Sequence, residues 1–472
     1  MGEALKNSSA RSAPKAWYHR IGPGLITACV VIGPGSIMTS SSVGANDSYA
    51  MLWVVAVSVV FMLVYMTLGA KLGVATTQSP CDLIRKKAGP WLSILVGIGV
   101  FFISAAFQSG NNIGVAAAFE AFIESKTIVA VLVVAFNGLA ILFLFAFKEM
   151  YKMLERLMMA FVATMLICFA INLLMLGPNL VDMASGLVPS LGRSRDLLSL
   201  LGLVGTTFVI TAAFYQSYLV KQKGWSSEDI KSGLIDARVG SAIMFLITLM
   251  LMSTAAAGLY TGQPVTLDNP VSVATSLETT FGSAAKIIFC VGLFSAAYSS
   301  FLVNSMIGGF MAADALGLGS KPTDLAPRLL TTAALLSGMS VGLAVLVYDF
   351  DRTPTIIAAQ AVTVVAAPLI AGVLLWLTSS RDVMGEHANG PITKTFAGIG
   401  LVLLIAMAGR TAFDTLPQSI EKYRDRQATA TADFSLTNDL SPLTRTISDD
   451  VPFTNDRFDA ALVERKTTTG MP

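Results

Sequence analysis

Residues Gly33, Pro34, Gly35 and Ser36 interrupt an apolar stretch that runs from residue 22 to residue 53. The two glycines permit backbone angles that other residues resist, and Pro34 lacks the N–H that a continuous helix needs. We therefore expect two half-helices that meet at an unwound hinge at about residues 32–36. The second half-helix would point its positive N-terminal end into the membrane, and carbonyl oxygens around Val30 would face the same space. Such an arrangement can bind an ion or a small polar solute; a proline kink that only shapes packing is the structural alternative.

A transporter built from inverted repeats needs a matching break in its second half. Counting five spans per repeat places that break in residues 197–220, whose centre combines Gly205 with threonines and β-branched residues. The centre holds no proline, so the sequence encodes the second break only weakly. We predict that both spans are discontinuous, at about residues 32–36 and 206–212, and lie side by side at the membrane midplane.

Three amides in a third apolar segment could line a polar pathway to these breaks. Gln108, Asn111 and Asn112 follow the spacing i, i+3 and i+4, which places them on one face of a helix. Polar side chains in a membrane span usually face the interior of the helix bundle. The structural alternative is hydrogen bonding between neighbouring helices.

The composition identifies the class of protein that carries these segments. Of the 472 residues, 54% are hydrophobic and only 13% are charged, with a mean hydropathy of +0.67; soluble domains carry roughly 25% charged residues. The chain is therefore an integral protein of a lipid bilayer. Its net charge of +2 is distributed between the apolar runs, which argues against nucleic acid as a partner. The four cysteines lack metal-ligand spacing, and no cofactor is implied.

About eleven segments are long and apolar enough to cross roughly 30 Å of hydrocarbon. Every second loop is basic, so the positive-inside rule places the N-terminal leader, residues 1–20, in the cytoplasm. The transmembrane domain then covers residues 21–412, and residues 413–472 form a polar C-terminal tail. We number the predicted spans 1 to 11, at residues 22–46, 49–76, 91–119, 128–147, 157–177, 197–220, 240–260, 284–312, 328–347, 354–378 and 393–411.

Several stretches together resemble the Nramp (natural resistance-associated macrophage protein) family of proton-coupled divalent metal transporters. They are the opening "GPG" and the second "PG" ten residues later, then "GANDSYAMLWVV", "AKLGVATTQ", "GLVGTTF", "SYLV" and "LTSSRDVMG". The similarity extends from about Ile21 to the end of span 11. It implies an all-α LeuT-type fold with two inverted five-helix repeats, at about residues 21–178 and 195–380, plus an extra span at 393–411. It also implies alternating access around a site made by spans 1 and 6, in a monomer of a bacterial inner membrane.

The chain departs from the family pattern at the residues that bind the metal. The family's first-span motif is Asp-Pro-Gly-Asn, and Gly33 and Ser36 stand in place of its Asp and Asn. The family's span-6 motif Met-Pro-His falls on Val209, Ile210 and Thr211. None of the family's side-chain metal ligands is retained there.

The titratable groups of the family are also replaced by amides. A later span-6 histidine falls on Gln216, and the acidic pair of span 3 falls near Gln108 and Asn111. What the resemblance retains is the span-10 glutamine and two carbonyl positions. The implied substrate-binding residues are Val30, Gly33, Ser36, Thr206, Val209, Thr211 and Gln360, and the implied pathway residues are Gln108, Asn111, Asn112 and Gln216.

Two functions fit this pocket, which would carry no formal negative charge. The first is a secondary transporter that moves a divalent cation, weakly bound and partly hydrated, by alternating access without proton coupling, because a dehydrated divalent ion usually needs carboxylate ligands. The second is a carrier of a small anionic or zwitterionic solute bound at the N-terminus of the span-1 half-helix. We do not expect an enzyme, because no span combines a nucleophile, a base and an orienting group at plausible spacing.

Overall fold

The computed structural model describes residues 22–146, 149–189, 197–265, 267, 269–348 and 352–415. The side chains of residues 197–198, 280, 352–364 and 414–415 are likewise not described. The predicted leader 1–20 and nearly all of the predicted tail 413–472 lie outside the described residues. Contacts divide the chain after Phe413, and the description that follows concerns the unit that precedes Asp414.

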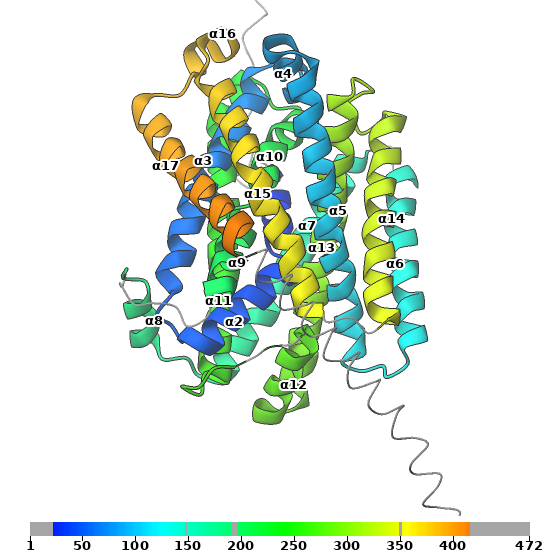
Figure 1. The fold of residues 1–472 in the computed structure, drawn as a ribbon, viewed down its shortest axis with the longest axis vertical. Coiled ribbons are helices and arrows are strands. Elements are labelled where there is room, and N and C mark those ends of the chain that lie inside the picture. The colour runs from blue at the N-terminus through cyan, green and yellow to red at the C-terminus, as the bar shows by residue number, and fades with distance from the viewer. Residues whose placement is uncertain are drawn as a thin grey trace, which may run out of the picture. The chain divides into compact units, whose positions relative to one another are not determined.

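The predicted spans all fall on helices of this unit (Figure 1). Within the described residues, nine helical segments are long and apolar enough to cross a membrane, and a bent pair makes a tenth. The helices that match predicted spans are α1 (Pro23–Val31) with α2 (Pro34–Asp47), α3 (Leu52–Ala75), α5 (Pro90–Glu120), α6 (Lys126–Ala146), α7 (Met150–Leu176), α9 (Leu197–Thr207) with α10 (Ile210–Gln222), α11 (Ile230–Leu259), α13 (Ser283–Ala315), α14 (Leu325–Val347), α15 (Arg352–Ser379) and α17 (Pro391–Arg410).

Four short helices connect these spans: α4 (Pro80–Ala88), α8 (Leu180–Gly186), α12 (Pro270–Phe281) and α16 (Arg381–Met384). Figure 1 shows α4 and α16 at one end of the bundle and α8 and α12 at the other. Proline stands in the first turn of α1, α2, α4, α5, α12 and α17, where its missing N–H removes no helical hydrogen bond. The sequence thus marks where many of these helices begin.

The first predicted break is confirmed. α1 ends at Val31, α2 begins at Pro34, and the two axes differ by 58°. Gly33 between them has φ −123° and ψ −176°, which is extended backbone that any residue adopts. The expectation that the glycines supply unusual backbone angles is therefore wrong at Gly33. Pro34 interrupts the helix. At Gly33 the neighbouring Ser300 and Asn111 leave little room for a side chain.

The second break lies inside the predicted interval, although no proline marks it. α9 ends at Thr207 and α10 begins at Ile210, with extended backbone at Val209. Between the two helices the Phe208 ring packs edge-on against Tyr65 of α3, with ring centroids 5.4 Å apart. Phe208 is therefore buried against α3 at the point where the helix is interrupted.

The two broken spans lie side by side. The Ser36 hydroxyl at the start of α2 lies 3.4 Å from the Thr206 carbonyl oxygen near the end of α9. The hydroxyl groups of Thr39 and Thr206 are 3.2 Å apart. The predicted adjacency of the breaks is thus confirmed by direct contacts between α2 and α9.

Contact between α1 and α11 depends on two glycines. A methyl group built at Gly240 of α11 would lie 2.6 Å from the carbonyl carbon and 3.0 Å from the Cα atom of Gly24. Both are backbone atoms that no side-chain rotation can move. The helices can therefore approach this closely only because neither residue carries a side chain.

We expect the substitution Gly240→Ala to lower the free energy of unfolding by about 1–3 kcal/mol, as overpacking does in other tightly packed interiors. Thermal unfolding of the purified protein in detergent measures the change. Gly99→Ala on α5 is the matched control, because a methyl group there meets no described atom within 4 Å. Equal melting temperatures for both variants would contradict the close approach of α1 and α11.

Candidate functional site

The first break joins α1, α5 and α13. Pro34 stands four residues after Val30, so the carbonyl of Val30 lacks the N–H that a continuous helix would offer. The hydroxyl of Ser300 on α13 donates to this carbonyl oxygen instead, at 3.2 Å. A methyl group built at Gly33 would lie 3.0 Å from Ser300 Oγ and 3.4 Å from Asn111 Oδ1. The structure therefore places Val30 and Gly33 in one buried polar contact with two neighbouring helices.

Ser36 and Thr206 meet on the other side of the break. The Ser36 hydroxyl donates to the carbonyl of Val31 and lies close to the carbonyl of Thr206. Both side chains are buried. Ser36 therefore closes the gap between α1 and α2 with its own hydroxyl, and its oxygen is shared between the two broken spans.

Val209 and Thr211 line a different space from the contact around Gly33. With Phe208 they border a cavity of about 10 Å³, against Phe107 of α5 and Ala367 of α15. The buried Thr211 hydroxyl makes no hydrogen bond within the described residues. The backbone of Gln360 lies in α15, but its side chain is outside the described residues. The role of these three residues in binding stays a prediction.

The amides of α5 bond to neighbouring helices. The Gln108 amide donates to the Phe301 carbonyl of α13 at 3.0 Å, and Asn111 donates to Gln108 Oε1 at 3.1 Å. Asn112 accepts from the Asn137 amide of α6 at 2.7 Å. All of these side chains are buried. Gln108 and Asn112 thus make the interhelical bonds that the sequence offered as the alternative, whereas Asn111 bonds within α5. A pathway along the three amides stays a prediction.

Gln216 contacts a buried carboxylate that sequence reasoning missed. Its amide Nε2 donates to Asp236 Oδ2 of α11 at 3.0 Å, and its Oε1 accepts from the Thr27 hydroxyl of α1. Asp236 also accepts from the backbone N–H groups of Gly22 and Gly24, at 2.8 and 2.6 Å. A carboxylate at the N-terminus of a helix satisfies donors that lack helical partners and complements the helix dipole. Asp236 therefore holds the start of α1.

Asp236 was not predicted as a buried residue because the predicted span 7 began too late in the sequence. The predicted span 7 began at residue 240, whereas α11 begins at Ile230 and buries Asp236 completely. The hydropathy of residues 230–239 is low because they include Lys231, Asp236 and Arg238, so the pattern placed the carboxylate in a loop. Only the neighbouring helix start shows why a charge is buried there.

A second buried carboxylate, Asp314, joins the end of α13 to α10 and α4. It accepts from the Tyr218 hydroxyl at 2.5 Å, the Ser79 hydroxyl at 2.6 Å and the Cys81 backbone N–H at 3.1 Å. Burial, and then the charge of Asp314, raise the pKa of the Cys81 thiol well above its ordinary value. Cys81 is therefore an unreactive packing residue.

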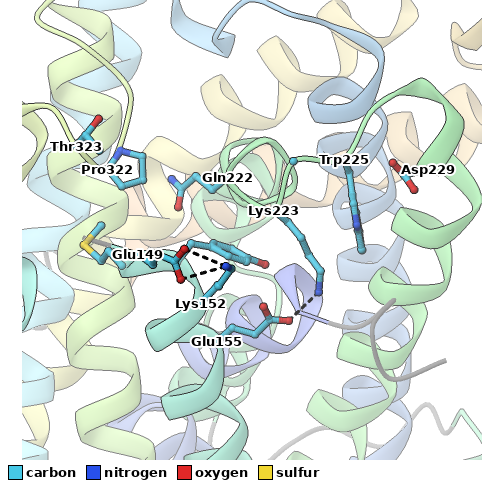
Figure 2. A pocket seen from close by; sticks show the side chains of 12 residues that line it. Glu149, Lys152, Glu155, Gln222, Lys223, Trp225, Asp229, Pro322 and Thr323 are labelled. Atoms are coloured by element: carbon cyan, nitrogen blue, oxygen red, sulfur yellow. Dashed lines mark hydrogen bonds and ion pairs between the residues drawn. The ribbon is translucent and has the colours of Figure 1, made fainter. Parts of the chain in front are cut away.

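A pocket of about 700 Å³ opens at the end of the bundle where α1 begins (Figure 2). An ion pair between Lys223 and Glu155, at 2.7 Å, lies on its wall. A methyl group built at Gly22 would lie 2.5 Å from Lys223 Nζ, so this pair rests against the start of α1. A second pocket of about 620 Å³ shares Gln222, Trp225 and Pro322 with the first. The breaks themselves are buried, and both of these pockets lie at one end of the bundle.

The oxygen atoms around the first break carry no formal charge. The carbonyls of Val30 and Thr206, the hydroxyls of Ser36 and Ser300 and the amide of Asn111 are all uncharged. Among the described residues, no group of three or more His, Cys, Asp or Glu side chains could hold a metal ion. Uncharged oxygens bind hard cations weakly and do not select soft transition metals.

Known structures share this fold. The manganese transporter of Eremococcus coleocola, in complex with an aromatic bis-isothiourea substituted compound, superposes with a TM-score of 0.72 at 18% identity and covers 84% of this chain and 86% of that one. MhsT in complex with L-phenylalanine gives a TM-score of 0.53 at 18% identity, over 82% of this chain and 98% of that one. The fold is therefore of the LeuT type, with two inverted five-helix repeats.

The sequence also matches named relatives along most of its length. The divalent metal cation transporter MntH of Pectobacterium carotovorum is 24% identical over 423 residues, which cover 88% of this chain and 99% of the relative. The MntH of Erwinia tasmaniensis is 26% identical, over 85% of this chain and 95% of the relative. These relatives are transporters of the membrane, not enzymes. The family profile described as natural resistance-associated macrophage protein-like, Nramp, matches residues 24–414, and the chain therefore belongs to the Nramp family.

Proposed function

We propose that this protein is a secondary transporter that moves a divalent cation by alternating access around the two breaks. The observation that carries the proposal is the contact between the broken spans, with Ser36 beside the Thr206 carbonyl, in a chain of a divalent metal transporter family. Broken helices at mid-membrane are tolerated where they line a site or a cavity. The pocket beside Lys223 and Glu155 would then be the opening through which the ion leaves or enters.

The bound ion would keep part of its water. The oxygens of Ser36, Val30 and Thr206 are uncharged, and stripping a divalent ion completely usually requires carboxylate ligands. Water molecules that remain on the ion can in turn donate hydrogen bonds to these carbonyl oxygens. This supports weak binding and little preference for soft metals. We further propose that the protein works as a monomer in a bacterial inner membrane, with its N-terminus in the cytoplasm.

We expect transport without proton uptake, because Gln108, Asn111 and Gln216 cannot titrate. The measurement is uptake of Mn²⁺, Mg²⁺ and Ca²⁺ into proteoliposomes with a pH-sensitive dye trapped inside. Saturable cation flux with no dye response is the expected result. A dye signal that rises with the cation and disappears in Gln216→Ala would contradict it, and would point to the neighbouring Asp236 as the proton carrier.

A second candidate is a carrier of a small anionic or zwitterionic solute. The observation that favours it is the start of α2, where Gly33 provides no side-chain cap for the N–H groups of the first turn. Such N–H groups can bind a carboxylate. The same liposomes distinguish the candidates, since an anion carrier would take up a labelled carboxylate and ignore the divalent cations.

A further inference from the structure

The two pockets at the end of the bundle differ in charge. The first, beside Lys223, is lined by three carboxylates and two lysines, and its lysines pair with Glu149 and Glu155, at 3.1 and 2.7 Å. The second, of about 620 Å³, is lined by Lys221 and Lys321 and by no carboxylate of the described residues. Its volume suits an organic ligand, since such pockets measure about 300–1,000 Å³. The lining therefore favours a cation in the first pocket and an anion in the second.

Lys221 has one hydrogen-bond partner within the described residues, and that partner is not a carboxylate. Its ammonium group donates to the carbonyl oxygen of Thr76, directly after the end of α3. An ammonium group has three N–H donors, so two remain for a ligand. The contact is partly buried, and a charge taken out of water is costly unless an opposite charge pairs with it. An anion in the pocket would supply that pair.

The carboxylate of Asp314 attracts Lys221 but does not line the pocket. Its Oδ1 accepts from the Ser79 hydroxyl and its Oδ2 from the Tyr218 hydroxyl. Both of these donors belong to the wall of the pocket. Asp314 is therefore occupied by its own hydrogen bonds, and the ammonium group of Lys221 stays available to a ligand in the cavity.

Lys321 brings the second charge from the segment before α14. Asp324 accepts from the backbone N–H groups of Ser320 and Lys321, at 3.1 and 2.9 Å, which fixes the turn that carries this lysine. The Lys321 side chain is exposed, and Thr77 and Ser227 add hydroxyl groups to the same lining. A phosphate monoester carries a charge of about −1.5 to −2 and three strong acceptor oxygens. Two ammonium groups and several hydroxyls around one cavity match that pattern of charge and acceptors.

We propose that the second pocket binds a phosphate group between Lys221 and Lys321. With the N-terminus in the cytoplasm, as proposed above, this end of the bundle faces the cytoplasm, where basic pockets between membrane helices bind the head groups of anionic lipids. A soluble phosphate compound offers the same chemistry, so the two ammonium groups would recognise either source. The bound phosphate would tie the end of α10 to the segment before α14. Binding does not depend on the transported solute and is measured without a divalent cation.

The test titrates inorganic phosphate into the full-length protein in detergent, against sodium chloride of equal ionic strength, with the melting temperature as the readout. Phosphate should raise the melting temperature in a saturable way, because a ligand that binds only the folded state stabilises it. In Lys221→Gln the apparent Kd should rise about tenfold or more, since a partly buried charged partner is lost. Glutamine can still donate to the Thr76 carbonyl, which preserves the fold. In Lys321→Gln the rise should be about two- to fivefold, because that lysine is exposed.

The matched control is Lys394→Gln on α17, which removes an exposed lysine that lines neither pocket. It should leave the phosphate titration unchanged. The site is overturned if phosphate and chloride act alike on the native protein, or if Lys221→Gln and Lys321→Gln titrate like the native protein. Cation flux into liposomes tests the proposed transport function separately, so either can fail without the other.

A second arm identifies the source of the phosphate group. The native protein and Lys221→Gln are placed in nanodiscs of phosphatidylcholine, with or without phosphatidic acid, and glycerol 3-phosphate is the soluble probe. If a lipid is the source, phosphatidic acid should raise the melting temperature of the native protein more than that of the variant. If a soluble compound is the source, only glycerol 3-phosphate should distinguish the two proteins. Either result supports the site, and equal responses of both proteins to both probes would contradict it.

Discussion

Replacing Asp236 with asparagine is expected to destabilise the protein by about 2–4 kcal/mol, because a buried N–H that loses its acceptor costs about 1–3 kcal/mol and hydrogen bonds to charged groups exceed neutral ones. The native carboxylate accepts from the backbone of Gly22 and Gly24 and from Gln216, with each oxygen occupied. An asparagine offers one acceptor oxygen and turns an NH₂ group toward at least one of these donors. The start of α1 would then lose its attachment to α11.

Two measurements separate this effect from general damage. The melting temperature in detergent should fall by several degrees, and the buried thiol of Cys29 on α1 should react faster with a maleimide, located by mass spectrometry. Asp182→Asn, on the exposed helix α8, is the control and should change neither quantity. Unchanged melting together with unchanged Cys29 reactivity would show that Asp236 does not hold α1 in place.

Restoring metal ligands at the breaks is expected to raise the affinity for Mn²⁺ at least about tenfold, or about 1.4 kcal/mol. The variant combines Gly33→Asp, Ser36→Asn and Val209→Met, which add a carboxylate, an amide oxygen and a thioether. The extended backbone at Gly33 accepts any residue. A Cβ atom built there would lie 3.0 Å from Ser300 Oγ and 3.3 Å from Ser300 Cβ, so α13 must shift by a few tenths of an ångström to admit the aspartate. Isothermal titration calorimetry measures the binding.

The matched control for this variant replaces Gly33→Asp by Gly33→Asn and keeps the other two changes. Aspartate and asparagine have nearly the same shape, so the comparison isolates the added charge. The asparagine version should gain little affinity, because the carboxylate supplies most of the attraction for a divalent ion. Tight Mn²⁺ binding by the native protein, or no gain in a folded aspartate variant, would remove residues 33, 36 and 209 from the site.

Much of the architecture is a local property of the chain. A long apolar run predicts a membrane helix wherever it stands, so the predicted spans coincide with helices even where their ends differ by several residues. The first break lies at Pro34, whose missing N–H favours an interruption of the helix. Pro368 stands inside the continuous helix α15, so a proline alone does not decide where a span breaks. The Nramp resemblance likewise rests on short stretches of sequence and is confirmed by the family match.

What only the tertiary structure decided is the pairing of buried polar groups. Asp236 accepts a hydrogen bond from Gly22, which lies 214 residues away in the sequence, and Ser300 donates one to Val30, which lies 270 residues away. Phe208, between the two halves of the second broken span, packs against Tyr65 of another helix. At Gly33 the neighbouring Ser300, rather than the backbone angles, limits the space for a side chain. Hydropathy and helix breaking act on neighbours along the chain, whereas a buried donor or acceptor is satisfied by whichever helix packs beside it, and that neighbour is fixed only when the bundle has formed.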